Sequence, residues 1–112
     1  MQKNGNGTVG WVDVERGLVS REAFTSDDVY RQEMSRIFDR TWIYLAHESE
    51  IPSPGDYVVR QLGSAPVIVV RDDGGQIRVM LNSCRHRGTK LCRADAGRID
   101  NLTCPFHGWT YQ

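Results

Sequence analysis

Two short stretches decide the fold and the chemistry of this chain, residues 83–88 (SCRHRG) and residues 103–109 (TCPFHGW). Each stretch offers one thiol and one imidazole, spaced as Cys-x-His in the first and Cys-x-x-His in the second. Thiolate sulfur and imidazole nitrogen are common ligands of zinc and of iron in proteins. The four candidate ligands are Cys84, His86, Cys104 and His107. Their types and spacing predict a metal site that is built from two loops.

The mixed composition of each loop separates two kinds of metal site. A structural zinc site usually draws adjacent ligands of one type from a single turn, such as Cys-x-x-Cys. A two-iron cluster with two thiolates on one iron and two imidazoles on the other can take one ligand of each type from each loop. The pattern therefore favours a [2Fe-2S] cluster of the Rieske kind. Zinc, which uses the same ligand types, stays open as the alternative.

Outward from these loops, the residues before Cys84 alternate between apolar and polar, with Pro and Gly between the alternating runs. A period of two is typical of β-strands. We expect strands over residues 42–47, 57–62, 67–71 and 76–82, and a short edge strand within residues 11–16. The run Asp72-Asp73-Gly74-Gly75 predicts a hairpin turn, because glycine tolerates the positive φ that such turns need. The expected fold class is mainly β, a small antiparallel domain.

One helix is expected before these strands, over about residues 26–40. Apolar side chains such as Tyr30 and Met34 recur there at helical spacing, and Thr25 or Ser26 can cap the start. The chain then divides into an N-terminal extension (residues 1–24), a helix (25–41) and the β domain (42–112). The first eight residues are expected to form a flexible polar tail. The β domain is expected to be incomplete at its C-terminal end, because the sequence stops shortly after the second loop.

The composition excludes several classes of partner. The chain has 112 residues, and its 14 basic and 14 acidic side chains give a net charge of zero. Nucleic acids and anionic membranes both attract a field of basic residues, so neither is expected as a partner. No apolar stretch approaches the roughly 20 residues that a membrane span needs, and the N-terminus lacks a secretion signal. We therefore expect a cytoplasmic protein, in which cysteines serve metal binding more often than structural disulfides.

Longer motifs around the two loops resemble one family closely. These motifs are residues 17–21 (GLVSR), 43–52 (IYLAHESEIP), 82–88 (NSCRHRG) and 104–111 (CPFHGWTY). Together with the expected helix, they are similar to the α (large) subunit of aromatic-ring-hydroxylating dioxygenases, which are Rieske non-haem iron oxygenases. The resemblance implies an antiparallel Rieske domain in which Cys84 and Cys104 bind one iron of the [2Fe-2S] cluster, and His86 and His107 bind the other.

The same resemblance implies a role in the catabolism of aromatic hydrocarbons. In such oxygenases electrons from NADH or NADPH pass through a flavin reductase, and often a ferredoxin, to the Rieske cluster. They then reach a mononuclear Fe(II) in a catalytic domain of a neighbouring α subunit, where O₂ is added to an aromatic ring to give a cis-dihydrodiol. The α subunits are expected to form a trimer, with or without a small β subunit.

This chain cannot supply the catalytic iron site itself. Such a site needs two histidines and one carboxylate, and His47 is the one histidine outside the two loops. The expected function is therefore that of an N-terminal fragment, inactive alone, of a dioxygenase α subunit. A stand-alone Rieske-type ferredoxin, an electron carrier, is the alternative. The long segment before Cys84 favours the oxygenase.

Five residues beside the ligands are expected to shape the site. Gly88 and Gly108 either let backbone N–H groups approach the cluster sulfurs or are ordinary turn residues. Arg85 and Arg87 either offset the negative charge of the iron–sulfur core or are solvated loop residues. Trp109 is expected to cover one side of the cluster and exclude water.

Two further residues have candidate metal-binding side chains but are expected to be structural. Cys92 is expected to pack beneath the first loop as a buried cysteine that binds no metal. His47 is expected to be a hydrogen-bonded histidine rather than a ligand.

Overall fold

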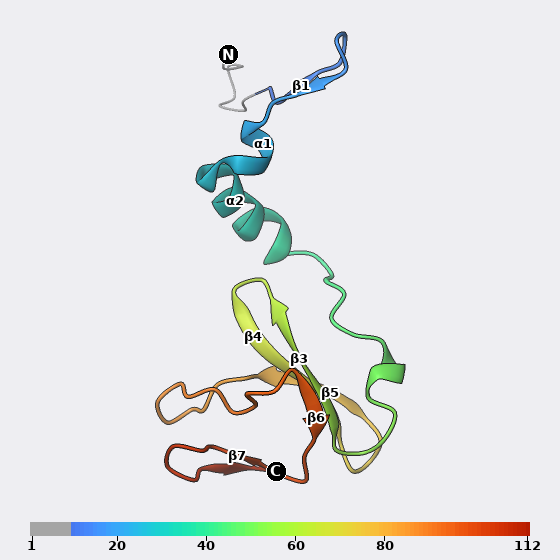
Figure 1. Cartoon of the computed structure of the whole chain (residues 1–112), viewed down its shortest axis with the longest axis vertical. Helices are drawn as coiled ribbons and strands as arrows, with labels where there is room; N and C mark the ends of the chain where they lie inside the picture. The colour runs from blue at the N-terminus through green and yellow to red at the C-terminus, as the bar shows by residue number, and fades with distance from the viewer. Residues whose placement is uncertain (1–9) are drawn as a thin grey trace. The chain divides into compact units, whose positions relative to one another are not determined.

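The computed structural model describes residues 10–112, which form two compact units (Figure 1). One unit ends at Trp42, and the other spans Ile43–Gln112. The polar tail expected over the first eight residues lies outside the described residues. Among residues 10–112, every helix is too short or too polar to cross a lipid bilayer.

The first unit combines a small hairpin with a short helical segment. Its elements are β1 (Val12–Asp13), β2 (Leu18–Val19), α1 (Glu22–Thr25), α2 (Asp27–Glu33) and a π-helical turn, η1 (Met34–Phe38). The strands β1 and β2 pair in antiparallel fashion, so the strand expected within residues 11–16 is present but only two residues long. The helix expected over residues 26–40 is present as α2 and η1. Ser26 caps it, because its Oγ accepts the Val29 N–H at 3.4 Å.

The second unit is built on one antiparallel sheet of four strands in the order β5-β4-β3-β6. The strands are β3 (Asp56–Leu62), β4 (Ala65–Arg71), β5 (Ile77–Leu81) and β6 (Ala96–Arg98). The strands expected over residues 57–62, 67–71 and 76–82 are therefore confirmed, within one or two residues at their ends. The pairing runs through the β3–β4 hairpin, which sets Val58 opposite Val69, and the β4–β5 hairpin, which sets Val69 opposite Val79.

The expected turn joins β4 to β5. The N–H of Gly75 donates to the carbonyl oxygen of Asp72 at 2.9 Å, and the N–H of Asp72 donates to the carbonyl oxygen of Gln76 at 2.8 Å. Gly75 has a φ of +81°, a conformation that glycine adopts at little cost. The glycine at this position thus fixes the register of the hairpin.

Residues 42–47 were expected to form a strand, and that prediction is wrong. The segment belongs to no sheet. Its alternation is real, because Ile43 and Leu45 are half-buried whereas Trp42 and Tyr44 are exposed. The alternation does not come from strand pairing. Leu45 and Ala46 pack against a buried cluster on one face of the sheet instead of pairing along its edge. That cluster consists of Ile51, Val58 and Val69.

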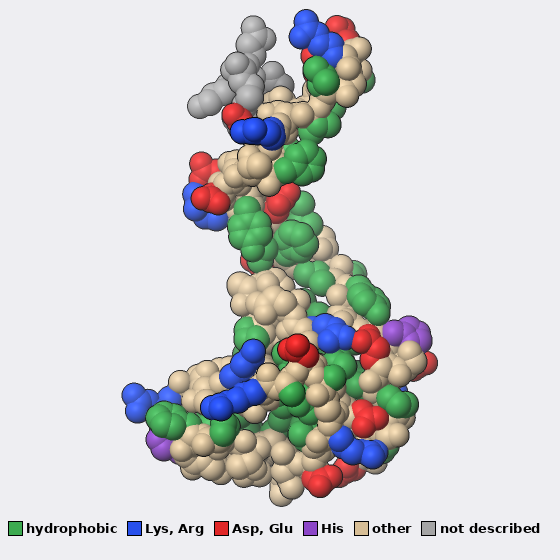
Figure 2. Space-filling view, viewed as in Figure 1, with side chains coloured by type: hydrophobic (Ala, Val, Ile, Leu, Met, Phe, Trp, Pro, Cys, Tyr) green, Lys and Arg blue, Asp and Glu red, His purple; other side chains and the backbone are tan. Residues whose placement is uncertain are grey.

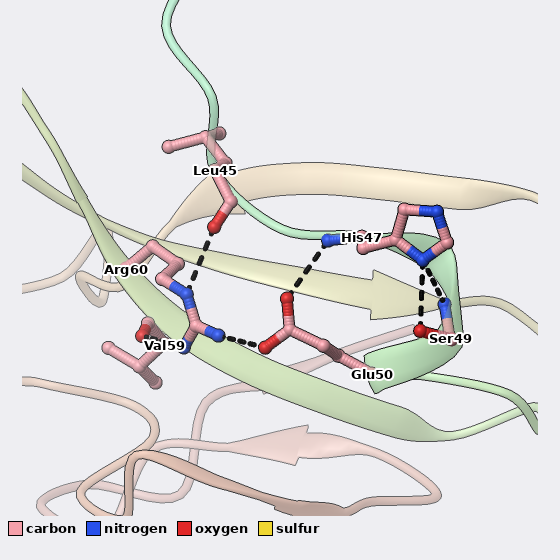
Figure 3. Close-up of polar contacts among 6 residues, drawn as sticks. All are labelled: Leu45, His47, Ser49, Glu50, Val59 and Arg60. Carbon is pink, nitrogen blue, oxygen red and sulfur yellow. Dashed lines mark hydrogen bonds and ion pairs between the residues drawn. The ribbon is translucent and has the colours of Figure 1, made fainter.

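Arg60 of β3 fastens this segment to the sheet (Figure 3). Its Nε donates to the carbonyl oxygen of Leu45 at 3.0 Å, and its guanidinium also pairs with the carboxylate of Glu50. The other oxygen of Glu50 accepts the His47 N–H at 2.9 Å, at the start of a 3₁₀ turn, η2 (Glu48–Glu50). The Arg60 side chain therefore satisfies both the Leu45 carbonyl and the Glu50 carboxylate. In a strand, that carbonyl would instead accept a backbone N–H from a neighbouring strand.

The opposite face of the sheet carries a second buried cluster, which extends beneath the two loops. Its buried members are Tyr57, Ile68, Val70, Cys92 and Leu102. The first three come from β3 and β4, and Leu102 begins β7 (Leu102–Thr103), which pairs with β8 (Thr110–Tyr111). The loops thus rest on the sheet through a shared apolar core.

Candidate metal centre

The two loops have the same backbone closure although their sequences differ. In the first loop the N–H of Gly88 donates to the carbonyl oxygen of Cys84 at 2.8 Å. The N–H of Cys84 donates to the carbonyl oxygen of Thr89, also at 2.8 Å. The second loop repeats both bonds, from Gly108 to Cys104 at 3.0 Å and from Cys104 to the carbonyl of Trp109 at 2.8 Å. In each loop the closure therefore spans a cysteine, a histidine and a glycine.

A glycine is required at the same place in each closure. Gly88 has a φ of +74° and Gly108 a φ of +77°, in the left-handed region that residues with a Cβ rarely adopt. Open space or ordinary contact surrounds the position of a Cβ at both sites. Backbone conformation rather than crowding therefore explains these two glycines, which supports their interpretation as turn residues.

The two loop cysteines are buried side by side. The exposed fraction is 3% for Cys84 and 2% for Cys104, and the neighbouring Cys104 side chain is among the groups that lower the pKa of the Cys84 thiol. The Tyr111 hydroxyl lies 3.2 Å from the Cys84 Sγ. Its oxygen also accepts the Arg85 N–H at 2.9 Å, which leaves its own hydrogen free for the sulfur. This hydrogen bond lowers the pKa of the Cys84 thiol, against the opposing effect of burial.

The two loop histidines lie together at the surface. The ring centroids of His86 and His107 are 4.8 Å apart, with an angle of 73° between the planes. Trp109 stacks on His86 at 4.8 Å and 10°, and Phe106 lies 4.0 Å from His107. All four rings are exposed. Trp109 was expected to cover the cluster, and its observed contact is with the imidazole of His86.

The arginines of the first loop have no side-chain partner within the described residues. Arg85 and Arg87 are exposed, and neither side chain takes part in an ion pair or hydrogen bond there. The two loops extend from one end of the second unit (Figure 1), and Figure 2 shows basic side chains beside a histidine at that end.

Cys92 is buried and His47 is hydrogen-bonded, as expected from the sequence, and their lack of a metal-binding role stays a prediction. Cys92 is 5% exposed and belongs to the core beneath the loops, where burial raises the pKa of its thiol. The Nδ1 of His47 accepts the Ser49 N–H at 3.2 Å and caps η2 (Figure 3).

Two residues at the site were given no role in the sequence analysis. Tyr111 reaches the first loop from β8, and Asn82, 1% exposed, lies at the base of the same loop. Tyr111 precedes the last residue of the chain, and its separation of 27 residues from Cys84 gave no local signal. A polar residue directly between an apolar strand and a ligand loop was the available signal for Asn82.

Like side chains are therefore paired with like: thiol beside thiol within the core, and imidazole beside imidazole at the surface. Within residues 10–112, no three His, Cys, Asp or Glu side chains converge on one point suited to a single metal ion. Residues 41–112 match the Rieske [2Fe-2S] domain. The chain belongs to the Rieske [2Fe-2S] domain family. A [2Fe-2S] cluster is the cofactor that this family implies.

Comparison with characterised proteins gives the kind of protein in which this Rieske domain occurs. The chain is 48% identical over 99 residues to the α subunit of N,N-dimethyl phenylurea N-demethylase from Sphingobium sp. strain YBL2, covering 88% of the chain and 22% of the relative. It is 46% identical over 100 residues to the α subunit of biphenyl 2,3-dioxygenase from Rhodococcus jostii RHA1, covering 89% and 22%. The predicted resemblance to dioxygenase α subunits is confirmed, and the chain spans about a fifth of the length of these relatives.

Solved structures agree with this similarity. Naphthalene 1,2-dioxygenase from Rhodococcus sp. superposes with a TM-score of 0.73 at 55% identity, over 75% of this chain and 19% of that one. A quaternary ammonium Rieske monooxygenase in its apo form superposes with a TM-score of 0.75 at 34% identity, over 81% and 26%. The antiparallel β fold expected from the sequence is therefore confirmed as that of a Rieske domain.

The Rieske side chains fit the implied cluster. Such a cluster needs two thiolates for one iron and two imidazole nitrogens for the other. The buried thiols of Cys84 and Cys104 and the adjacent rings of His86 and His107 are donors of these two types and could hold the cluster.

Proposed function

We propose that Cys84 and Cys104 hold one iron of a Rieske [2Fe-2S] cluster and that His86 and His107 hold the other. The observation that carries this proposal is the sorting of the four side chains, thiols together inside and imidazoles together outside. The repeated closure of the two loops supports it, because each loop offers one donor of each type in a similar backbone frame.

When bound, the cluster supplies one-electron transfer. The residues of this chain determine which side of the cluster is shielded from water and which side is open to a partner protein. The core around Cys84 and Cys104 keeps water from the thiolate side, and Tyr111 donates a hydrogen bond to the Cys84 sulfur. His86 and His107 are exposed to solvent and so would provide the short route for an electron to or from a docked protein.

We further propose that the whole protein is the α subunit of an aromatic-ring-hydroxylating oxygenase, in which this chain is the electron-transfer domain. The support comes from the similar biphenyl 2,3-dioxygenase and benzene 1,2-dioxygenase α subunits. An NAD(P)H-dependent reductase, with or without a ferredoxin, would supply the electrons. The whole protein would add O₂ to an aromatic ring as a cis-dihydroxylation, using a mononuclear Fe(II) domain outside this chain.

The similar α subunits support an assembly of several subunits. We propose a trimer of α subunits, with or without β subunits, in the cytoplasm, where cysteines stay reduced for metal binding.

Anaerobic reconstitution of the full-length protein with iron and sulfide tests the cluster. We expect two irons and two sulfides per chain and, after reduction, the electron paramagnetic resonance signal of a Rieske centre. The variants His86→Ala and His107→Ala should each lose that signal. One zinc per chain without the signal would contradict the proposal.

The coding sequence downstream of Gln112 tests the oxygenase against the stand-alone carrier. A continuation with a paired-histidine and carboxylate iron site supports the oxygenase. A stop codon soon after Gln112 would instead indicate a Rieske ferredoxin.

A further inference from the structure

Asn82 is the one buried polar side chain among residues 10–112, and its amide bonds to the backbone of Leu91 and Cys92, at the end of the segment 83–92 that contains the first ligand loop. Its Oδ1 accepts the N–H of Leu91 at 3.0 Å and the N–H of Cys92 at 2.8 Å. Its Nδ2 donates to the carbonyl oxygen of Cys92 at 2.8 Å. Asn82 thus joins the start of the loop to its end.

The backbone of Asn82 is itself fixed to the sheet. Its N–H donates to the carbonyl oxygen of Pro66 in β4 at 2.8 Å, one step beyond the last paired residue of β5. The side chain therefore acts from a position that the sheet already holds in place. The three hydrogen bonds of the buried Asn82 amide fix the orientation of their partners more strictly than an apolar contact of the same size would.

The second ligand loop is closed in a different way. There, Leu102 pairs with Tyr111 and Thr103 with Thr110 in the β7–β8 ladder. Leu102 lies two residues before its ligand cysteine and Tyr111 seven residues after it, and Asn82 and Leu91 hold the same two places around Cys84. No strand pairing exists at that place in the first loop. The Asn82 side chain supplies there the hydrogen bonds that a backbone ladder supplies in the second loop.

We infer that Asn82 is a positioning residue for the cluster: it closes the first loop so that Cys84 and His86 face Cys104 and His107. The inference rests on the proposed function for its consequence, cluster binding, but its structural part concerns the protein without cluster. Loss of the Asn82 side chain leaves two N–H groups and one carbonyl of the loop without partners in a buried place.

Two variants of the full-length protein test this role, with one control. Asn82→Leu keeps the approximate volume and removes all three bonds. Asn82→Asp keeps both acceptor bonds but cannot donate to the Cys92 carbonyl when ionised. Val69→Ala is the control, because it weakens the core on the opposite face of the sheet, away from the loops.

The first readout is made on the protein without metal. Diamide takes two electrons and two protons from a neighbouring pair of thiols, and peptide mapping detects the resulting Cys84–Cys104 disulfide. We expect Asn82→Leu to slow this cross-link by about ten-fold, as expected for a loop that has lost its buried hydrogen bonds. Asn82→Asp should fall between Asn82→Leu and the wild type, and Val69→Ala should match the wild type.

The second readout is iron and sulfide content after anaerobic reconstitution, with circular dichroism as the check on folding. We expect Asn82→Leu to retain on the order of a tenth of the wild-type cluster, and Val69→Ala to retain nearly all of it. If Asn82→Leu does not fold, the test rests on comparing Asn82→Asp with the wild type and Val69→Ala.

The outcomes separate this inference from the proposed function. Wild-type cross-linking and cluster content in both Asn82 variants, or equal losses in Val69→Ala, would overturn the role of Asn82. If the wild-type protein binds no iron–sulfur cluster while Asn82→Leu still slows the cross-link, the proposed function fails and Asn82 remains the closure of the loop.

Discussion

At the scale of single residues, Tyr111 links the two ligand loops through one oxygen atom. It accepts the Arg85 N–H and lies 3.2 Å from the Cys84 sulfur. Hydrogen bonds to cluster sulfurs favour the reduced, more negative state and so raise the reduction potential. Tyr111 is therefore the side chain in this chain that is best placed to tune a bound cluster.

The variant Tyr111→Phe removes that bond and keeps the ring. We expect the reduction potential to fall by roughly 20–60 mV, which corresponds to a hydrogen bond worth on the order of 1 kcal/mol. Protein-film voltammetry of the cluster-loaded protein measures the change. The matched control is Tyr44→Phe, whose ring is exposed in a segment outside the loops. An unchanged or raised potential in Tyr111→Phe would refute this assignment.

Burial gives Cys92 a different physical role from that of the loop cysteines. Loss of water raises the pKa of the Cys92 thiol, and the same core raises the pKa of Tyr57. The folded state therefore holds the Cys92 proton more tightly than the unfolded chain does. Its contribution to stability is complete below the unfolded pKa of about 8.5 and is lost as the pH rises through the folded pKa.

The pH dependence of urea unfolding tests this assignment on the protein without metal. We expect the free energy of unfolding of the wild type to fall more steeply between pH 8 and pH 10 than that of Cys92→Ala, which has no thiol to ionise. The variant should be less stable at neutral pH, since it leaves a small cavity. Equal slopes in the two proteins would show that another group, such as Tyr57, governs the alkaline loss.

At the scale of elements, glycine chemistry and apolar alternation were sufficient to predict the strands β3, β4 and β5 and the turn between β4 and β5. The alternation near Trp42 predicted one strand too many, because half-burial against a sheet face produces the same period as pairing at a sheet edge. The contact that decides between them, Arg60 to the Leu45 carbonyl, joins residues 15 apart and has no signature in either segment alone.

The Asp72–Gly75 turn offers a matched pair of glycines. Gly75 has a positive φ and open space around it, whereas Gly74 has no positive φ. We expect Gly75→Ala to lower the free energy of unfolding by about 1 kcal/mol and Gly74→Ala to change it much less. Urea unfolding of both variants gives the comparison. Equal effects would mean that the turn tolerates a side chain in the left-handed region.

At the scale of the whole molecule, a net charge of zero conceals an uneven distribution. The first loop and the residues after it carry four exposed basic side chains and no acidic one between Ser83 and Arg93. The basic residues are Arg85, Arg87, Lys90 and Arg93. None of them forms an ion pair with the described part of the chain. A basic rim beside exposed imidazoles favours an electron-donor protein with an acidic surface.

The double variant Lys90→Glu/Arg93→Glu tests this electrostatic contribution without altering a proposed ligand. We expect the second-order rate of reduction by the donor protein to fall by about ten-fold at low salt, and its decrease with added salt to become weaker. Stopped-flow absorbance at several salt concentrations measures both. Arg21→Glu/Arg36→Glu, in the other unit, changes the net charge by the same amount and is the control. A donor rate that ignores both salt and the double variant would contradict the basic rim as a docking element.

The sequence by itself determined the donor atoms, the metal chemistry they allow, most of the sheet strands and the hairpin turn. These depend on residue type, short spacing and local backbone preference, which are properties of residues close together in the sequence. Only the tertiary structure decided that the thiols lie together in the core and the imidazoles together outside. It also decided the contacts of Asn82 and Tyr111, because the packing of the loops on the sheet brings together residues 10 and 27 positions apart.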